Sequence, residues 1–159
     1  MLRRSVLGAL FSLSTLSIGA CGSDSTTAPA PTIETTTFAT SLGVNLAAST
    51  KTPYGMYYRD IVVGNGAAAV DGKTVALHYS GSLVDGTNFE TNGTNDTPIS
   101  FILGTGHVIP GWDLGIKGML VGGQRQLIIP PSLAYGSSAN GKIPANSILV
   151  FTVSLVSVK

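Results

Sequence analysis

Val108-Ile109-Pro110-Gly111-Trp112 carries the only tryptophan of the chain and begins its main predicted helix. Pro110 suits a first helical turn, because the N–H that proline lacks would have no partner there. Apolar residues then recur at the three- and four-residue spacing of a helix face, namely Trp112, Ile116, Met119 and Leu120. Gly122-Gly123 marks a stop. The sequence therefore predicts a short helix of about three turns.

The composition indicates a β-rich globular protein with tight turns. Charged residues make up 11% of the 159 residues, hydrophobic residues make up 43%, and 20 residues are glycine. Removing Arg3 and Arg4 from the nine basic residues leaves seven, against eight acidic ones. The chain therefore has no basic patch, and nucleic acid is not expected as a partner.

The first twenty residues have the order of a secretory signal peptide. Met1-Leu2-Arg3-Arg4 is basic, residues 6–18 are mostly apolar, and Gly19-Ala20 precede the only cysteine, Cys21. The apolar run is too short to span a bilayer comfortably. Ile18-Gly19-Ala20-Cys21 resembles the bacterial lipobox, in which the cysteine is lipidated and becomes the first mature residue. We therefore expect a signal peptide at 1–20 cleaved before Cys21, the alternative being an unmodified thiol.

Lipidation of Cys21 implies an extracytoplasmic protein that is anchored to a bacterial membrane. Because the chain has one cysteine, the mature fold must be held by its core without a disulfide. Gly22, rather than Asp, follows the cysteine, and by resemblance to enterobacterial lipoproteins this points to the outer membrane. Arg3-Arg4 leaves twin-arginine export open beside the general secretory route.

We expect a flexible tether at residues 21–50 and a folded domain at 51–159. From residue 22 to about 37 the chain is mainly Ser, Thr, Ala and Pro. This composition buries too little apolar surface to offset the entropy of ordering. Residues 38–48 are more apolar, and the sequence leaves open whether they dock loosely or form a short helix.

The domain contains four or five predicted antiparallel strands. Asp85-Gly86 is a strong hairpin signal, and Pro130-Pro131 stops a strand. The strands are expected at 54–63, 74–83, 99–103, 124–129 and 147–158. The fold class is therefore α+β: a curled antiparallel sheet, or half-barrel, wrapped over one short helix.

The sequence offers little for metal or covalent catalysis. His78 and His107 are far apart and lack metal-ligand spacing, and no nucleophile elbow, phosphate loop or dinucleotide fingerprint occurs. Glu90 and Asp113 are the only carboxylates near the aromatic residues, which is thin support for paired acids. No metal and no cofactor are expected. What remains is an aromatic and aliphatic set: Tyr79, Phe89, Ile99, Phe101, Val108, Ile109, Trp112, Tyr135, Ile143 and Phe151.

Several separated blocks resemble one family. Tyr79-Ser80-Gly81-x-Leu83-x-Asp85-Gly86-x-x-Phe89 is similar to the signature of FKBP-type peptidyl-prolyl isomerases, and Gly104-x-x-x-Val108-Ile109-x-Gly111-Trp112 has the spacing found in that family. Three later blocks occur in the family's order: Ala134-Tyr135-Gly136, Ile143-Pro144 and Leu149-Val150-Phe151. The resemblance covers about residues 51–159. It implies an FKBP-like fold and an enzyme that rotates X–Pro bonds and assists protein folding.

Carried onto this chain, the resemblance implies a proline pocket. Its catalytic residues would be Tyr79, Phe89, Glu90, Ile109, Trp112, Tyr135 and Phe151. Trp112 would form the floor, while the Ile109 N–H and the Tyr135 hydroxyl would bind substrate carbonyls. The resemblance also implies substrate contacts at Ile99, Val108 and Ile143.

Three features depart from the family pattern. Glu90 stands where Asp is typical, Ile99 stands where an aromatic residue is common, and the loop from Tyr135 to Ile143 is one residue shorter. These bear on rate, sequence preference and macrolide affinity. The resemblance implies a monomer whose partners are unfolded or partly folded exported polypeptides and macrolide inhibitors. Rival interpretations are a chaperone or binding module with little isomerase activity, and a purely structural lipoprotein.

Overall fold

The computed structural model describes residues 32–159. The predictions for the signal peptide, for Cys21 and for the first part of the tether lie outside these residues. Within the described range, no helix combines the length and the apolar character that a membrane crossing requires.

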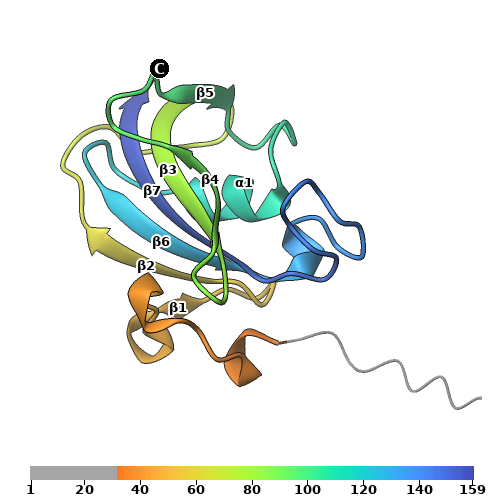
Figure 1. Ribbon diagram of the computed structural model, residues 1–159. Coiled ribbons are helices and arrows are strands. Elements are labelled where there is room, and N and C mark those ends of the chain that lie inside the picture. The colour runs from red at the N-terminus through yellow and green to blue at the C-terminus, as the bar shows by residue number, and fades with distance from the viewer. Residues whose placement is uncertain (1–31) are drawn as a thin grey trace, which may run out of the picture.

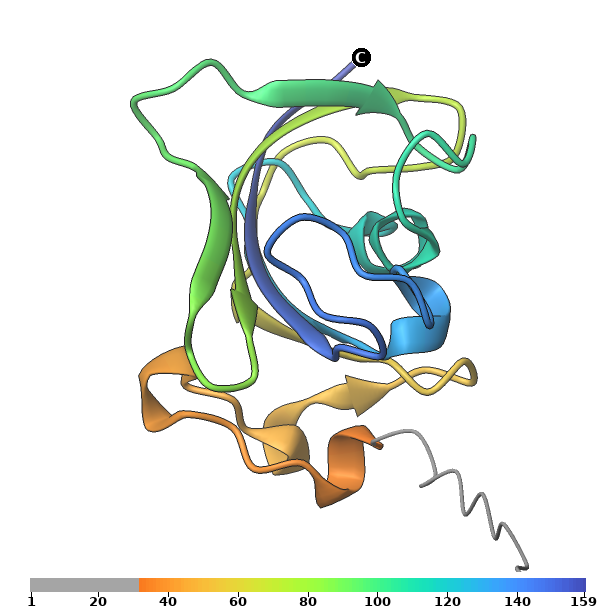
Figure 2. The ribbon, with the colours of Figure 1, turned by 45° about the vertical axis from the view of Figure 1, so that its right-hand side comes forward.

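In this described part of the chain, one antiparallel sheet curls around the short helix α1, Pro110–Ile116 (Figures 1 and 2). The strands run in the spatial order β1-β2-β6-β7-β3-β4, and β5 pairs with β3. Their bounds are β1 Thr50–Lys51, β2 Tyr57–Val62, β3 Thr74–Leu83, β4 Asn88–Asn92, β5 Ile99–Ile102, β6 Gln124–Ile129 and β7 Leu149–Val158. The predicted half-barrel over one helix is confirmed, with β1 and β4 added to the expected strands.

Strand β3 pairs with three other strands and follows its predicted span. It pairs with β7 over most of its length. Its other edge is shared, because β5 pairs with residues 74–77 and β4 pairs with residues 79–82. A register shift between Gly81 and Ser82 interrupts the β4 pairing, as a bulge does.

The helix is shorter than the sequence predicted. Helix α1 spans Pro110–Ile116, about two turns. It ends because Gly118 takes a φ of +79°, a left-handed value that glycine adopts without strain. Met119 is nevertheless buried, and Leu120 forms a bridge with Ala68. Their apolar spacing thus reflects burial beyond the helix, which periodicity cannot distinguish from a further turn.

Two glycines on one face of α1 allow it to lie close to the sheet. A Cβ at Gly111 would lie 2.4 Å from Ile129 Cγ2, and one at Gly115 would lie 2.7 Å from Leu127 Cδ2. Such distances are well inside van der Waals contact. Glycine at these positions therefore determines how deep the helix, and Trp112 with it, sits against the sheet.

Arg125 anchors the C-terminal end of α1. Its side chain is 8% exposed; Nε donates to Asp60 Oδ1 at 2.6 Å and Nη2 donates to Asp60 Oδ2 at 3.0 Å. Its Nη1 donates to the Gly115 carbonyl at 2.9 Å and to the Lys117 carbonyl at 3.2 Å. A cation at this end complements the helix dipole and satisfies carbonyls that lack helical partners.

Residues 32–50, here called the N-terminal strap, are packed on the sheet, so the prediction of a free tether is wrong for this part. Ile33 is 2% exposed and lies in a cluster with Tyr57, Ile128, Ile148 and Val150. The strap lies below β2 in Figure 1 and leads into β1. Its short 3-10 helices span Ile33–Thr35, Thr40–Leu42 and Leu46–Ala48. Both alternatives for residues 38–48 thus apply, since they form single turns and also dock.

Candidate active site

A cavity of about 460 Å³ opens on the concave side of the sheet beside the start of α1. Its lining residues are Tyr79, Glu90, Ile99, Gly106, His107, Val108, Ile109, Trp112, Tyr135 and Phe151. An adjoining cavity of about 300 Å³ is lined by Phe89, Glu90, Tyr135, Asn140, Gly141, Lys142 and Ile143. Eight of the ten predicted pocket residues therefore line the first cavity, and Phe89 and Ile143 line the second. Their roles in catalysis remain predictions.

Trp112 lies at the floor of the larger cavity and is 5% exposed. Tyr79 meets its ring edge-to-face with centroids 4.9 Å apart, and Phe151 does so at 5.3 Å. Phe101, from β5, lies 6.0 Å away. These are favourable aromatic geometries. The buried indole N–H has no acceptor within residues 32–159, which is a cost at the pocket floor.

The wall between the two cavities depends on a glycine that the sequence analysis did not place in the site. Phe89 and Phe151 pack edge-to-face with centroids 5.6 Å apart. A Cβ at Gly81 would lie 2.6 Å from the Phe89 ring and 2.7 Å from the Phe151 ring. An isolated glycine inside a strand pattern is a recognised signal of such close approach. Gly81 is therefore a positioning residue for both rings.

Asp113 holds the loop that carries Val108 and Ile109. Its Oδ1 accepts from the Gly104 N–H at 2.8 Å, and its Oδ2 accepts from the Gly106 N–H at 3.0 Å. The carboxylate is thus engaged with the loop and is not paired with Glu90 as a second acid. His107, which sequence reasoning weighed only as a metal ligand, lines the cavity instead.

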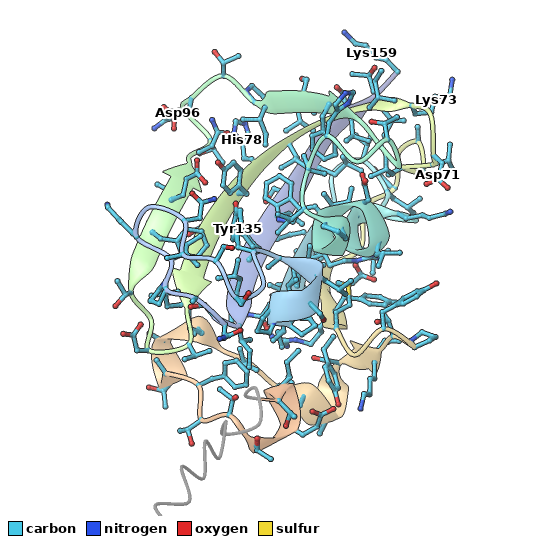
Figure 3. All side chains as sticks on the ribbon, turned by 90° about the vertical axis from the view of Figure 1, so that its right-hand side faces the viewer. Asp71, Lys73, His78, Asp96, Tyr135 and Lys159 are labelled. Atoms are coloured by element: carbon cyan, nitrogen blue, oxygen red, sulfur yellow. The ribbon has the colours of Figure 1, made fainter. Side chains whose placement is uncertain are left out.

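Two potential hydrogen-bond donors at the cavity have no acceptor among the residues that the structure describes. Ile109 is the N-cap of α1, and its carbonyl accepts from the Trp112 N–H at 2.9 Å. Its own N–H has no acceptor within residues 32–159, and neither has the Tyr135 hydroxyl. Figure 3 shows Tyr135 in front of the concave face, with the labelled charged side chains at the periphery. Both donors are therefore available to a bound carbonyl oxygen.

The ionisable groups of the cavity are few. Burial, followed by the neighbouring Glu90 carboxylate, raises the pKa of Tyr79 to about 12. The Tyr79 hydroxyl is therefore protonated at neutral pH. His78 lies outside the cavity and is hydrogen-bonded through Nδ1 to Asn92 Oδ1 at 2.8 Å. In the described range, no three His, Cys, Asp or Glu side chains are grouped so that they could hold a metal ion.

The sequence matches a family profile. Residues 66–156 fit the family described as FKBP-type peptidyl-prolyl cis-trans isomerase. FK506-binding protein 2 of Yarrowia lipolytica is 56% identical over 88 residues, which cover 55% of this chain and 61% of that protein. FK506-binding protein 4 of Aspergillus fumigatus is 50% identical over 105 residues, covering 66% of this chain but 21% of that protein. The chain thus spans only part of the length of these curated relatives.

Solved structures agree with the sequence match. FkpA from Escherichia coli is similar with a TM-score of 0.64 and 42% identity, over 70% of this chain and 52% of that chain. AtFKBP13 gives a TM-score of 0.63 and 39% identity, over 69% of this chain and 97% of that chain. Because the matched profile covers more than half of the sequence and includes the aromatic cavity, the chain belongs to the family of FKBP-type peptidyl-prolyl cis-trans isomerases.

Proposed function

We propose that this protein catalyses cis–trans isomerisation of X–Pro peptide bonds and thereby assists protein folding. The observation that carries the proposal is the cavity over Trp112, with its aromatic walls and its two free donors. Its volume of about 460 Å³ exceeds that of a proline ring and leaves room for the flanking backbone.

The physics of the reaction suits such a site. Rotation about a peptide bond faces a barrier of about 18–20 kcal/mol, because amide resonance must be broken. Uncatalysed X–Pro interconversion takes tens to hundreds of seconds and can limit folding. In the twisted amide the carbonyl has lost resonance and is less polar than in either planar isomer. An apolar site that binds the twisted form best lowers the barrier without a nucleophile or a metal ion.

The chain's own groups have separate tasks in this mechanism. The proline ring packs on Trp112 between Tyr79 and Phe151. The Ile109 N–H and the Tyr135 hydroxyl donate to substrate carbonyls and so orient the backbone around the rotating bond. Glu90 lies at the boundary of the two cavities and extends one methylene farther than the aspartate typical of the family.

We propose unfolded or partly folded exported polypeptides as substrates and macrolides as inhibitors. The relatives carry the name FK506-binding protein, which supports a macrolide test. Ile99 in place of an aromatic residue, together with the shorter loop before Ile143, is expected to alter inhibitor affinity more than the fold. The protein is proposed to act as a monomer.

We also propose that Cys21 carries the lipid that anchors the protein to a bacterial membrane, with the outer membrane as the expected site. Support comes from the order of charge, apolar run, small residues and cysteine at residues 1–21. Replacement Cys21→Ser should move the protein from the membrane fraction to the soluble periplasmic fraction. Unchanged fractionation would remove the anchor from the proposal and leave the isomerase untouched.

The decisive experiment measures refolding of a proline-limited test protein with and without the purified chain. Isomerase activity predicts acceleration of the slow phase that a macrolide inhibitor blocks. Phe89→Ala should abolish most of the acceleration, whereas Tyr54→Ala, an aromatic truncation at a side chain that is 63% exposed and outside both cavities, should retain it. No acceleration by folded wild-type protein would favour the rival, a binding module with an FKBP-like fold.

A further inference from the structure

Strand β4 carries two residues of the site but lies at an edge of the sheet. It is the last strand in the sheet order, and among residues 32–159 it pairs with β3 alone. Its residues Phe89 and Glu90 line the cavities. An edge strand with a bulge in its pairing has fewer restraints than an interior strand. The position of both side chains therefore depends on the turn that leads into β4.

That turn is closed by hydrogen bonds between its own residues, but the Val84 carbonyl has its partner outside the turn. The Gly86 N–H donates to the Leu83 carbonyl at 3.0 Å, the Leu83 N–H donates to the Thr87 carbonyl at 2.9 Å, and the Thr87 N–H donates to Asp85 Oδ1 at 2.8 Å. The Val84 carbonyl instead accepts from the backbone N–H of Ala39, in the N-terminal strap, at 2.8 Å.

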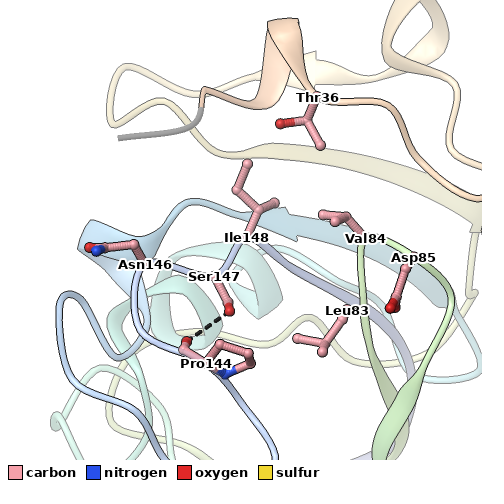
Figure 4. A pocket seen from close by; sticks show the side chains of 8 residues that line it. All are labelled: Thr36, Leu83, Val84, Asp85, Pro144, Asn146, Ser147 and Ile148. Atoms are coloured by element: carbon pink, nitrogen blue, oxygen red, sulfur yellow. Dashed lines mark hydrogen bonds between the residues drawn. The ribbon is translucent and has the colours of Figure 1, made fainter. Parts of the chain in front are cut away.

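The contact between strap and turn is close and local. A Cβ at Gly86 would lie 3.2 Å from Ala39 Cβ and 2.9 Å from Ser41 Oγ. Val84 also packs against the apolar cluster that contains Ile33. Figure 4 labels Thr36 of the strap and Val84 of the turn among the residues that line one pocket. The volume of this pocket is about 270 Å³. The strap therefore contacts the turn at Ala39, through a hydrogen bond to Val84 and a close approach to Gly86.

We propose that Ala39 is a positioning residue for the isomerase site. Its N–H holds the Val84 carbonyl, this bond fixes the turn, and the turn sets where β4 places Phe89 and Glu90. The strap on the convex face thus tunes substrate affinity on the concave face. This inference rests on the function proposed above, and it assigns a role in substrate binding to a segment outside residues 66–156 of the family match.

The test uses Ala39→Pro in the otherwise intact chain. Ala39 has φ −58° and ψ 137°, angles that proline adopts, so the change removes the N–H and leaves the backbone angles as they are. The probe is a chromogenic tetrapeptide of the Ala-Leu-Pro-Phe type, with binding followed by fluorescence of Trp112, the only tryptophan. We expect Kd and KM to rise about 2- to 10-fold, the range for one lost hydrogen bond. We expect kcat to change less than twofold, because the floor and the carbonyl donors are untouched.

Two control variants separate this role from general loosening of the strap. Ala39→Gly keeps the backbone N–H, so its Kd should equal that of the wild type. Glu34→Gln weakens the strap elsewhere, at the Glu34 carboxylate that accepts from Lys51 Nζ and the Tyr57 hydroxyl, and should leave Kd and KM unchanged. If Ala39→Pro does not fold, Ala39→Val replaces it. This variant keeps the N–H, but its larger side chain would displace the turn at Gly86, so Kd and KM are expected to rise by the same factor.

Wild-type Kd and KM in folded Ala39→Pro would overturn the proposal, and so would an equal rise in Glu34→Gln. The outcome is separable from that of the proposed function. If the wild-type chain binds the tetrapeptide but does not isomerise it, the isomerase proposal fails, and the role of Ala39 is then decided by Kd alone.

Discussion

Val150 and Phe151 are consecutive residues of β7, each 3% exposed, yet they lie on opposite faces of the sheet. Val150 is in the convex cluster with Ile33, beneath the N-terminal strap. Phe151 is in the concave core and lines the cavity over Trp112. Alternation along one strand therefore produces two apolar faces of similar burial and different use.

The difference lies in what covers each face. The convex cluster is covered by strap side chains that conform to it, among them Phe38, Leu42 and Val44. The concave face is covered by α1, a two-turn helix whose Trp112 contacts Phe101 of β5 but leaves the surface around Tyr79 and Glu90 uncovered. The space left beyond Trp112 is the cavity. A functional site thus arises where an apolar face is incompletely covered.

The sharpest test of this comparison substitutes the two neighbours separately. Phe151→Ala should lower the free energy of unfolding by about 3–5 kcal/mol and reduce kcat/KM about tenfold or more, because it removes a pocket wall. Val150→Ala should cost about 1–3 kcal/mol and leave kcat/KM near wild type. Urea unfolding and the tetrapeptide assay measure both. An equal loss of kcat/KM in Val150→Ala would show that the two faces are not functionally distinct.

The fit of α1 against the sheet is tested by Gly111→Ala. The added methyl would overlap Ile129, and overpacking of this kind costs about 1–3 kcal/mol. The helix should shift outward, with a change in Trp112 fluorescence. Leu114→Ala, on the same helix at a side chain that is 38% exposed, should change stability by about 0.5 kcal/mol at most. Similar melting temperatures for the two variants would contradict the close packing at Gly111.

A smaller effect on stability, with a clear effect on the site, is expected for Gly81→Ala. Its methyl would overlap the rings of Phe89 and Phe151, at a cost of about 1–2 kcal/mol if the rings move. Affinity for the tetrapeptide should fall because the wall is displaced. Ser82→Ala, one residue along on the convex face, is the matched control and should bind normally. Normal binding by both variants would show that the rings adjust without loss.

The smallest effect is a pH dependence on the convex side. Hydrogen bonding from Lys51 holds the pKa of Glu34 at about 2, below its ordinary value of 4.5. Because the folded-state pKa is the lower one, this contribution to stability is complete above pH 4.5 and is lost as the pH falls toward 2. The urea midpoint should fall over that range by less in Glu34→Gln than in wild type. Equal pH profiles would show that the exposed pair contributes nothing.

Much of the fold could be predicted because the signals were local. The alternation from Thr74 to Leu83 and the Asp85-Gly86 turn needed no knowledge of distant residues, and both were predicted correctly. The length of α1 was not, because Met119 is buried by the loop after Gly118 and not by a third turn. Periodicity reports burial, and two different backbones can bury the same residue.

The candidate site, like the fold, was predicted in part from the sequence. Spacing between blocks identified the ten pocket residues by family resemblance, and the structure brings them to two adjoining cavities. The positioning roles of Gly81 and Asp113 were missed. The glycine within the strand pattern signalled a close approach at Gly81, but not that its partners are the rings of Phe89 and Phe151. The contact between Asp113 and the loop at 104–106 has no local signal.

By itself, the sequence determined which residues alternate, where the hairpin turns, and which family signature the chain carries, since each is written in neighbouring residues. Only the tertiary structure decided that the strap docks and that the cavity lies on the concave face. Ile33 is buried by Ile128 and Val150, almost a hundred residues or more away in the chain. Ala39 of the strap donates to the carbonyl of Val84 in the turn between β3 and β4. Such contacts form only when the whole sheet has folded, because their partners are brought together by strand pairing and not by local preference.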